Sequence, residues 1–132
     1  MTGSTDLQIR SLKLEAISYK KLENYSKAEK SLLKALELKP EDNSLNHELA
    51  KVFFKCGKYN ECLRLLLKLS DRIKRRQILF KDIAMCYYKM NKLEKSLAAV
   101  QFSLSEDPAN ISSLYVEGLI QKELGNLEQS IL

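Results

Sequence analysis

The chain has 132 residues, of which 45% are hydrophobic and 30% are charged, and its formal net charge is +5. Four Gly and two Pro are too few for the many turns of an all-β sandwich or barrel. No apolar stretch approaches the roughly 20 residues that a membrane-spanning helix needs. The start of the chain lacks the basic-then-apolar pattern of a signal peptide. Three cysteines, an odd number, favour reduced thiols, so we expect an intracellular protein, in the cytoplasm.

Apolar residues recur every three or four positions along most of the chain, which indicates amphipathic α-helices. After a polar segment over residues 1–8, this pattern predicts helices over residues 9–22, 25–38, 43–56, 59–73, 77–90, 93–106 and 111–124, with an eighth helix starting near residue 127. Gly57, Asn91 and Gly125 fall at turns where a helix ends on a left-handed residue. Pro40 and Pro108 end two of the helices, because proline cannot continue one.

The helices recur in pairs with a period of 34 residues. Four features of the sequence follow this period. Similar segments begin at Glu23, Gly57, Asn91 and Gly125, and the aromatics Tyr19, Phe53 and Tyr87 have the same spacing. So do small residues on the first helix of each pair, Ala16, Ala50, Ala84 and Gly118, and small residues on the second helix, Ala28, Cys62, Ser96 and Ser130. Small residues on both helices of a pair let the two helices approach closely, and larger residues fill the space around them. The chain therefore divides into repeats over residues 9–42, 43–76 and 77–110 and an incomplete repeat over residues 111–132.

This arrangement resembles the tetratricopeptide repeat (TPR) family, whose 34-residue unit prefers a small residue at position 8, an aromatic at 11, Ala at 20 and Pro at 32. Counted from residue 9, the first repeat fills these positions with Ala16, Tyr19, Ala28 and Pro40. The resemblance implies an all-α, right-handed superhelical solenoid of antiparallel helix pairs, with about 3.5 repeats. It also implies a non-catalytic module for protein–protein interaction or scaffolding, with the first helix of each pair lining the concave surface.

In this family the concave surface commonly receives a segment of another protein, and here its positions combine basic, apolar and aromatic side chains. The expected partner-binding groove consists of Lys13, Ile17, Lys20, His47, Lys51, Phe54, Lys55, Lys81, Met85, Tyr88, Lys89, Tyr115 and Leu119. Such a groove suits a protein or peptide segment with acidic and hydrophobic residues. The alternative is that these lysines form an ordinary solvated helix face and that the apolar residues pack against a neighbouring helix.

One known mode of TPR binding does not fit this sequence. Co-chaperone TPR domains hold a C-terminal carboxylate with Lys and Asn from the first repeat, Asn from the second, and Lys and Arg from the third. The matching positions here are Lys13 and Ile17, then Glu48, then Ile78 and Asp82. Only the Lys agrees, and the two acidic residues would repel a carboxylate, so we expect no carboxylate clamp.

Catalytic and metal-binding patterns are missing from the sequence. His47 is the only His, and Cys56, Cys62 and Cys86 lack metal-ligand spacing. The four glycines are isolated and form no phosphate-binding loop. We therefore expect neither an enzyme nor a cofactor or metal.

Two other functions remain open. The incomplete last repeat ends in the apolar Ile131 and Leu132, which favours self-association, or else a module of a longer protein. A basic run is formed by Arg72, Lys74, Arg75 and Arg76 and would be the RNA-binding surface of a helical repeat. RNA binding is the less favoured of the two, because loops between repeats are usually only solvated.

Overall fold

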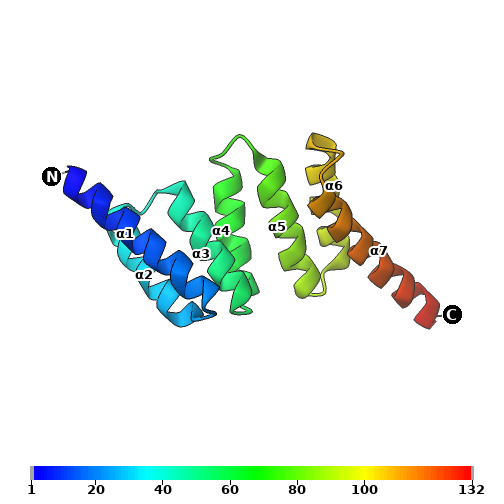
Figure 1. Ribbon diagram of the computed structural model, residues 1–132. Helices are drawn as coiled ribbons and strands as arrows, with labels where there is room; N and C mark the ends of the chain where they lie inside the picture. The colour runs from blue at the N-terminus through cyan, green and yellow to red at the C-terminus, as the bar shows by residue number, and fades with distance from the viewer. Residues whose placement is uncertain (1, 132) are drawn as a thin grey trace. The chain divides into compact units, whose positions relative to one another are not determined.

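The computed structural model describes residues 2–131, and their side chains from residue 3 to residue 128. The described residues form seven α-helices and no strand (Figure 1): α1 (Thr2–Lys21), α2 (Tyr25–Leu38), α3 (Asn43–Lys55), α4 (Tyr59–Ser70), α5 (Arg76–Lys89), α6 (Leu93–Glu106) and α7 (Ile111–Ile131). The chain divides into two compact parts, residues 1–65 and residues 66–132, called here the N-terminal part and the C-terminal part. The predicted all-α class is confirmed.

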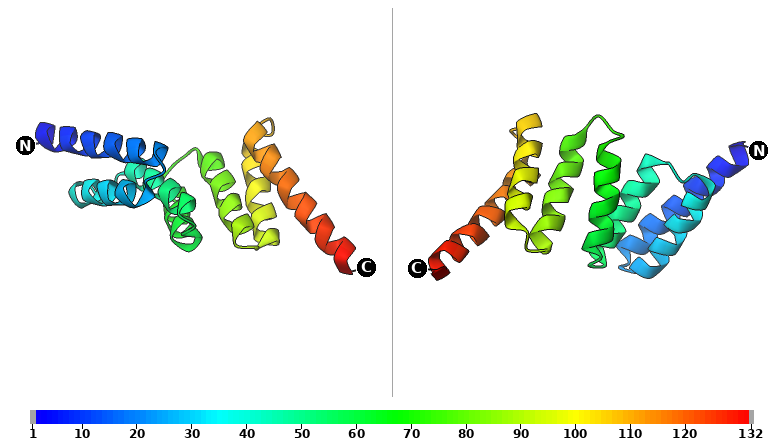
Figure 2. Two further views of the ribbon diagram at one scale, coloured as in Figure 1. Left: turned by 60° about the horizontal axis from the view of Figure 1, so that its bottom comes forward. Right: turned by 180° about the vertical axis from the view of Figure 1, so that it is seen from behind.

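Each part is built from helices that pack against their neighbours along the chain (Figure 2). In the N-terminal part α1 packs against α2, and α2 packs against α3. Its core is a cluster of buried apolar side chains: Ile9, Ala16, Ala28, Leu32, Ala35, Leu45, Leu49 and Val52. In the C-terminal part α6 packs against both α5 and α7, and α5 also contacts α7. Because sequential helices are neighbours, the first helices α1 and α3, or α5 and α7, are available to form a surface together.

The turn inside each of the first three helix pairs has the same hydrogen bonds. After α1 the amide of Glu23 donates to the carbonyl of Lys20 (3.0 Å), and the amide of Asn24 donates to the carbonyl of Tyr19 (2.8 Å). This pair of hydrogen bonds closes the end of a helix around one left-handed residue. The left-handed residues are Glu23 (φ 61°), Gly57 (φ 79°) and Asn91 (φ 61°). The turns predicted at Gly57 and Asn91 are confirmed, and the carbonyl of the repeating aromatic residue accepts the longer-range bond in all three pairs.

The turn predicted at Gly125 is wrong, because α7 runs without interruption from Ile111 to Ile131. A turn at this point is stabilised when a following helix packs back against the first one. No second helix follows α7 within the described residues, and continuing α7 through Gly125 costs only the roughly 1 kcal/mol of a glycine inside a helix. Gly118, which was expected to face a small residue of that helix, is exposed, and the side chain of its expected partner Ser130 lies outside the described residues.

Two other helix ends differ from the prediction by more than one residue. The first helix begins at Thr2 rather than residue 9, since a nucleated helix gains one hydrogen bond with each residue added. The fourth helix ends at Ser70 rather than residue 73. Continuing it to residue 73 would place Lys68 and Arg72 four residues apart on one face of the helix, where like charges repel.

Small residues hold the helices of the first and third pairs close together, as predicted. Ala16 and Ala28 are both buried in the core of the N-terminal part. In the C-terminal part the buried hydroxyl of Ser96 on α6 donates to the carbonyl of Ala84 on α5 over 2.6 Å. A serine at this position therefore satisfies its own polar group across the helix contact.

Candidate functional site

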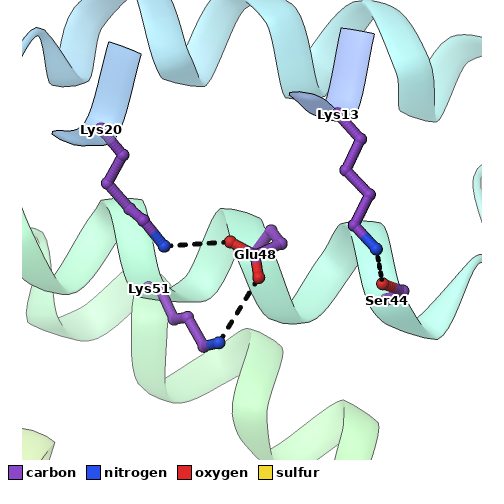
Figure 3. A network of polar contacts seen from close by, with 5 residues as sticks. All are labelled: Lys13, Lys20, Ser44, Glu48 and Lys51. Atoms are coloured by element: carbon purple, nitrogen blue, oxygen red, sulfur yellow. Dashed lines mark hydrogen bonds and ion pairs between the residues drawn. The ribbon is translucent and has the colours of Figure 1, made fainter. Parts of the chain in front are cut away.

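The N-terminal part brings seven of the predicted groove residues onto two helices. Every third or fourth residue of α1 and α3 contributes to this surface, because that spacing follows one face of a helix. The residues are Lys13, Ile17 and Lys20 on α1, and His47, Lys51, Phe54 and Lys55 on α3. Figure 3 shows the lysines of α1 pointing toward α3. We call this set the lysine face.

Glu48 lies at the centre of the polar contacts on the lysine face. Its two carboxylate oxygens each contact a different ammonium group, at 3.1 Å from Lys20 Nζ and 3.4 Å from Lys51 Nζ (Figure 3). The side chains of Lys20 and Glu48 are 24% and 16% exposed, whereas that of Lys51 is 45% exposed. The positive charges of two predicted groove lysines are therefore partly compensated within the chain.

The surroundings of Glu48 keep its carboxylate ionised. Burial by itself would raise the pKa of Glu48, but the hydrogen bond from Lys20 and the charges of Lys51 and Lys20 outweigh burial and hold the pKa below its ordinary value of 4.5. Glu48 thus carries a full negative charge at neutral pH.

Lys13 has a different environment. It donates a hydrogen bond to the hydroxyl of Ser44 on α3, a neutral group (Figure 3). This bond orients the ammonium group without cancelling its charge. Lys55, one turn after Lys51, is exposed. Lys13 and Lys55 are consequently the stronger positive centres of the lysine face.

Apolar side chains lie among these charges. Ile17 and Phe54 are half-buried, and the ring of Phe54 meets that of Tyr59 edge to face with centroids 5.3 Å apart. That contact fixes the orientation of Phe54 while leaving part of its ring accessible. His47 is half-buried on the same helix.

The C-terminal part carries the other six predicted groove residues on α5 and α7. Lys81 is half-buried and pairs with the adjacent Asp82 (3.1 Å), while Lys89 is exposed. Met85, Tyr88 and Leu119 are half-buried. Tyr115 is 67% exposed, which is unusual for a large aromatic side chain. This face is more apolar than the lysine face.

The basic run of the α4–α5 connection borders a cavity of about 580 Å³ in the C-terminal part. Its lining residues are Asp71, Arg72, Ile73, Lys74, Arg76, Phe102 and Glu106. Two carboxylates therefore stand among three basic residues. A nucleic acid backbone, with its regular negative charges, is poorly matched to such a mixed rim.

Two of the three cysteines have the environment of packing residues. Cys62 and Cys86 are buried, Cys56 is exposed, and none of these three cysteines is in a disulfide. Burial, helped by the charge of Glu29, raises the pKa of the exposed Cys56 thiol despite the opposing charge of Lys58. A raised pKa leaves less of the reactive thiolate at neutral pH.

Sequence patterns missed the role of Glu48. The repeat placed Glu48 on the concave surface, but Glu48 was not among the residues predicted to form the partner-binding groove. The spacing of three residues between Glu48 and Lys51 was the available signal, because residues three apart on a helix are neighbours. Its second partner, Lys20, lies 28 residues away on another helix and has no local signature.

Comparison with known proteins shows the fold and gives a family match over part of the chain. A family model of the tetratricopeptide repeat matches residues 14–42. The first TPR of Spaghetti (RPAP3), solved with the HSP90 peptide SRMEEVD, aligns with a TM-score of 0.80 at 17% identity, over 90% of this chain and 94% of that one. The chain has the fold of a TPR domain. The Hsp90 co-chaperone Cns1 of Saccharomyces cerevisiae shares this TPR fold with a TM-score of 0.85 at 21% identity, over 96% of this chain and 42% of its own.

A relative is also found at the level of sequence. The signal recognition particle subunit SRP72 of Dictyostelium discoideum is 33% identical over an alignment of 142 residues. The alignment covers 94% of this chain and 21% of that subunit. The chain thus spans about a fifth of the length of this relative. None of the TPR helices within residues 2–131 is both long and apolar enough to cross a membrane.

Proposed function

We propose that this TPR chain is a non-catalytic interaction module that binds a partner segment with acidic and hydrophobic residues along its first helices. The single observation that carries this proposal is the lysine face. There, charged Lys13 and Lys55 alternate with partly accessible Ile17 and Phe54. Charge at the rim steers an acidic segment, and apolar anchors supply affinity.

The proposed partner is a protein component of a particle like the signal recognition particle, to which the relative SRP72 belongs. That relative is a signal recognition particle subunit and matches almost the whole of this chain. The exposed Tyr115 and half-buried Tyr88 of the C-terminal part would add aromatic anchors for the same partner. Three cysteines without a disulfide support a reducing, intracellular site of action, with the cytoplasm proposed as the compartment.

Charge reversal on the first helices tests this proposal. The triple variant Lys51→Glu, Lys55→Glu and Lys89→Glu places negative charge where the acidic partner would lie. The tagged chain is used to capture proteins from a cell lysate, and captured proteins are quantified by mass spectrometry. We expect the unaltered chain to capture protein components of the signal recognition particle and the triple variant to lose most of this capture, by about tenfold or more.

A matched control separates location from net charge. Lys30, Lys34 and Lys68 are exposed on the second helices α2 and α4, and their reversal to Glu changes the net charge by the same amount. This control should capture the partner as the unaltered chain does. Equal capture by the first-helix variant would refute the groove, and absence of particle components from the unaltered chain's capture would refute the proposed partner.

A further inference from the structure

The contacts of Glu48 resemble those that a bound partner would make. A partner's carboxylate offered to Lys20 and Lys51 would sit between their ammonium groups, and Glu48 already holds that place at 3.1 and 3.4 Å. Because Glu48 is only 16% exposed, it is fixed between α1 and α3 and is poorly screened by water. A second carboxylate at the same point would meet a like charge.

We propose that Glu48 is a built-in competitor that sets the specificity of the lysine face, rejecting segments with clustered carboxylates and admitting segments whose carboxylates are spaced apart. This inference rests on the proposed binding of acidic segments to the lysine face. The chemical class selected is an internal acidic and hydrophobic segment, and the class rejected is a chain end that carries several carboxylates together.

The lysines differ in how they take part in this selection. Lys20 is the more buried partner of Glu48 and makes the shorter contact, so it stays with Glu48. Lys51 is 45% exposed and 3.4 Å away, so it can turn toward a partner at little cost. Lys13 is held by a neutral hydroxyl and keeps its charge for a separate carboxylate. The available positive charges are therefore spread along the face rather than gathered at one point.

A peptide bound by one of the structural neighbours provides the probe. The peptide SRMEEVD ends in an aspartate, so its last residue has both a side-chain and a terminal carboxylate. Fluorescein-labelled SRMEEVD is titrated with the unaltered chain, with Glu48→Gln and with Glu29→Gln, and binding is followed by fluorescence polarisation. Glu29 on α2 is the matched control, because it also pairs with a lysine, Lys58, at 3.2 Å and loses the same charge when substituted.

We expect Glu48→Gln to bind the peptide at least about tenfold more tightly than the unaltered chain, since it removes one repelling charge and releases two lysines. Glu29→Gln should stay within about twofold of the unaltered chain. Amidation of the peptide's C-terminus should abolish most of the gain. The inference is overturned if Glu48→Gln shows no gain, or if Glu29→Gln gains equally. Neither result bears on the proposed function. That function is tested separately by the capture experiment with the first-helix charge-reversal variant, in which the ligand is a captured protein and not this peptide.

Discussion

The substitution Leu32→Ala is expected to lower the free energy of unfolding by about 3 kcal/mol, because it removes a fully buried side chain and leaves a cavity that the helices cannot refill. Leu32 on α2 has no exposed surface and belongs to the core cluster of the N-terminal part. Small Ala16 and Ala28 in the same cluster already bring the helix backbones close, so little further closure can fill the space. Urea unfolding followed by circular dichroism measures the change.

The neighbouring residue gives the control for this prediction. Leu33 is the same residue type in the same helix but is 46% exposed. Leu33→Ala should cost less than about 1 kcal/mol, since it loses little buried area and alanine is the better helix former. Similar costs for the two substitutions would show that α2 does not bury the face assigned to it.

The second large effect concerns three residues that join α5, α6 and α7. The hydroxyl of Ser103 on α6 donates to the carbonyl of Gln77 on α5 (2.8 Å) and lies 2.8 Å from the hydroxyl of Ser113 on α7. A hydroxyl has one proton to give, so Ser113 must be the donor to Ser103. Ser103→Ala therefore removes two hydrogen bonds and leaves a buried hydroxyl on Ser113 without its acceptor. We expect a loss of about 2 kcal/mol in the free energy of unfolding.

A double-mutant cycle checks this network. Ser113→Ala alone should cost less, about 1 kcal/mol, because Ser103 keeps its bond to Gln77. The double variant should be no less stable than Ser103→Ala, since the stranded hydroxyl is gone. Urea unfolding of the three variants gives the coupling, and strictly additive costs would contradict the hydrogen-bonded chain from α5 to α7.

The features that the sequence predicted are those that the repeat itself imposes. Gly57 and Asn91 identify turns because a left-handed backbone is costly for most residues, and both turns are present. Glu23 shows the limit of that argument, since it adopts the same backbone (φ 61°) without being a residue that favours it. Its turn could be placed only because the 34-residue period put it there.

The features that the sequence did not predict depend on contacts between distant residues. Gly125 repeats Gly57 in sequence, yet α7 continues through it because no following helix packs against α7 within the described residues. Glu48 is compensated by Lys20 from another helix, so counting lysines overestimates the positive charge of the lysine face. Local sequence patterns determine where helices begin and end. The pairing of charges depends instead on whether side chains on different helices come within contact distance of each other.

Lysine footprinting of the complex tests most directly whether the first helices bind the partner. The free chain and the chain bound to its captured partner are each acetylated briefly, and the modification of every lysine is measured by mass spectrometry. We predict that Lys13, Lys51, Lys55 and Lys89 lose reactivity in the complex, while the exposed lysines of the second helices, Lys30, Lys34 and Lys68, keep theirs. Protection of the second-helix lysines, with the first-helix lysines unchanged, would contradict the account.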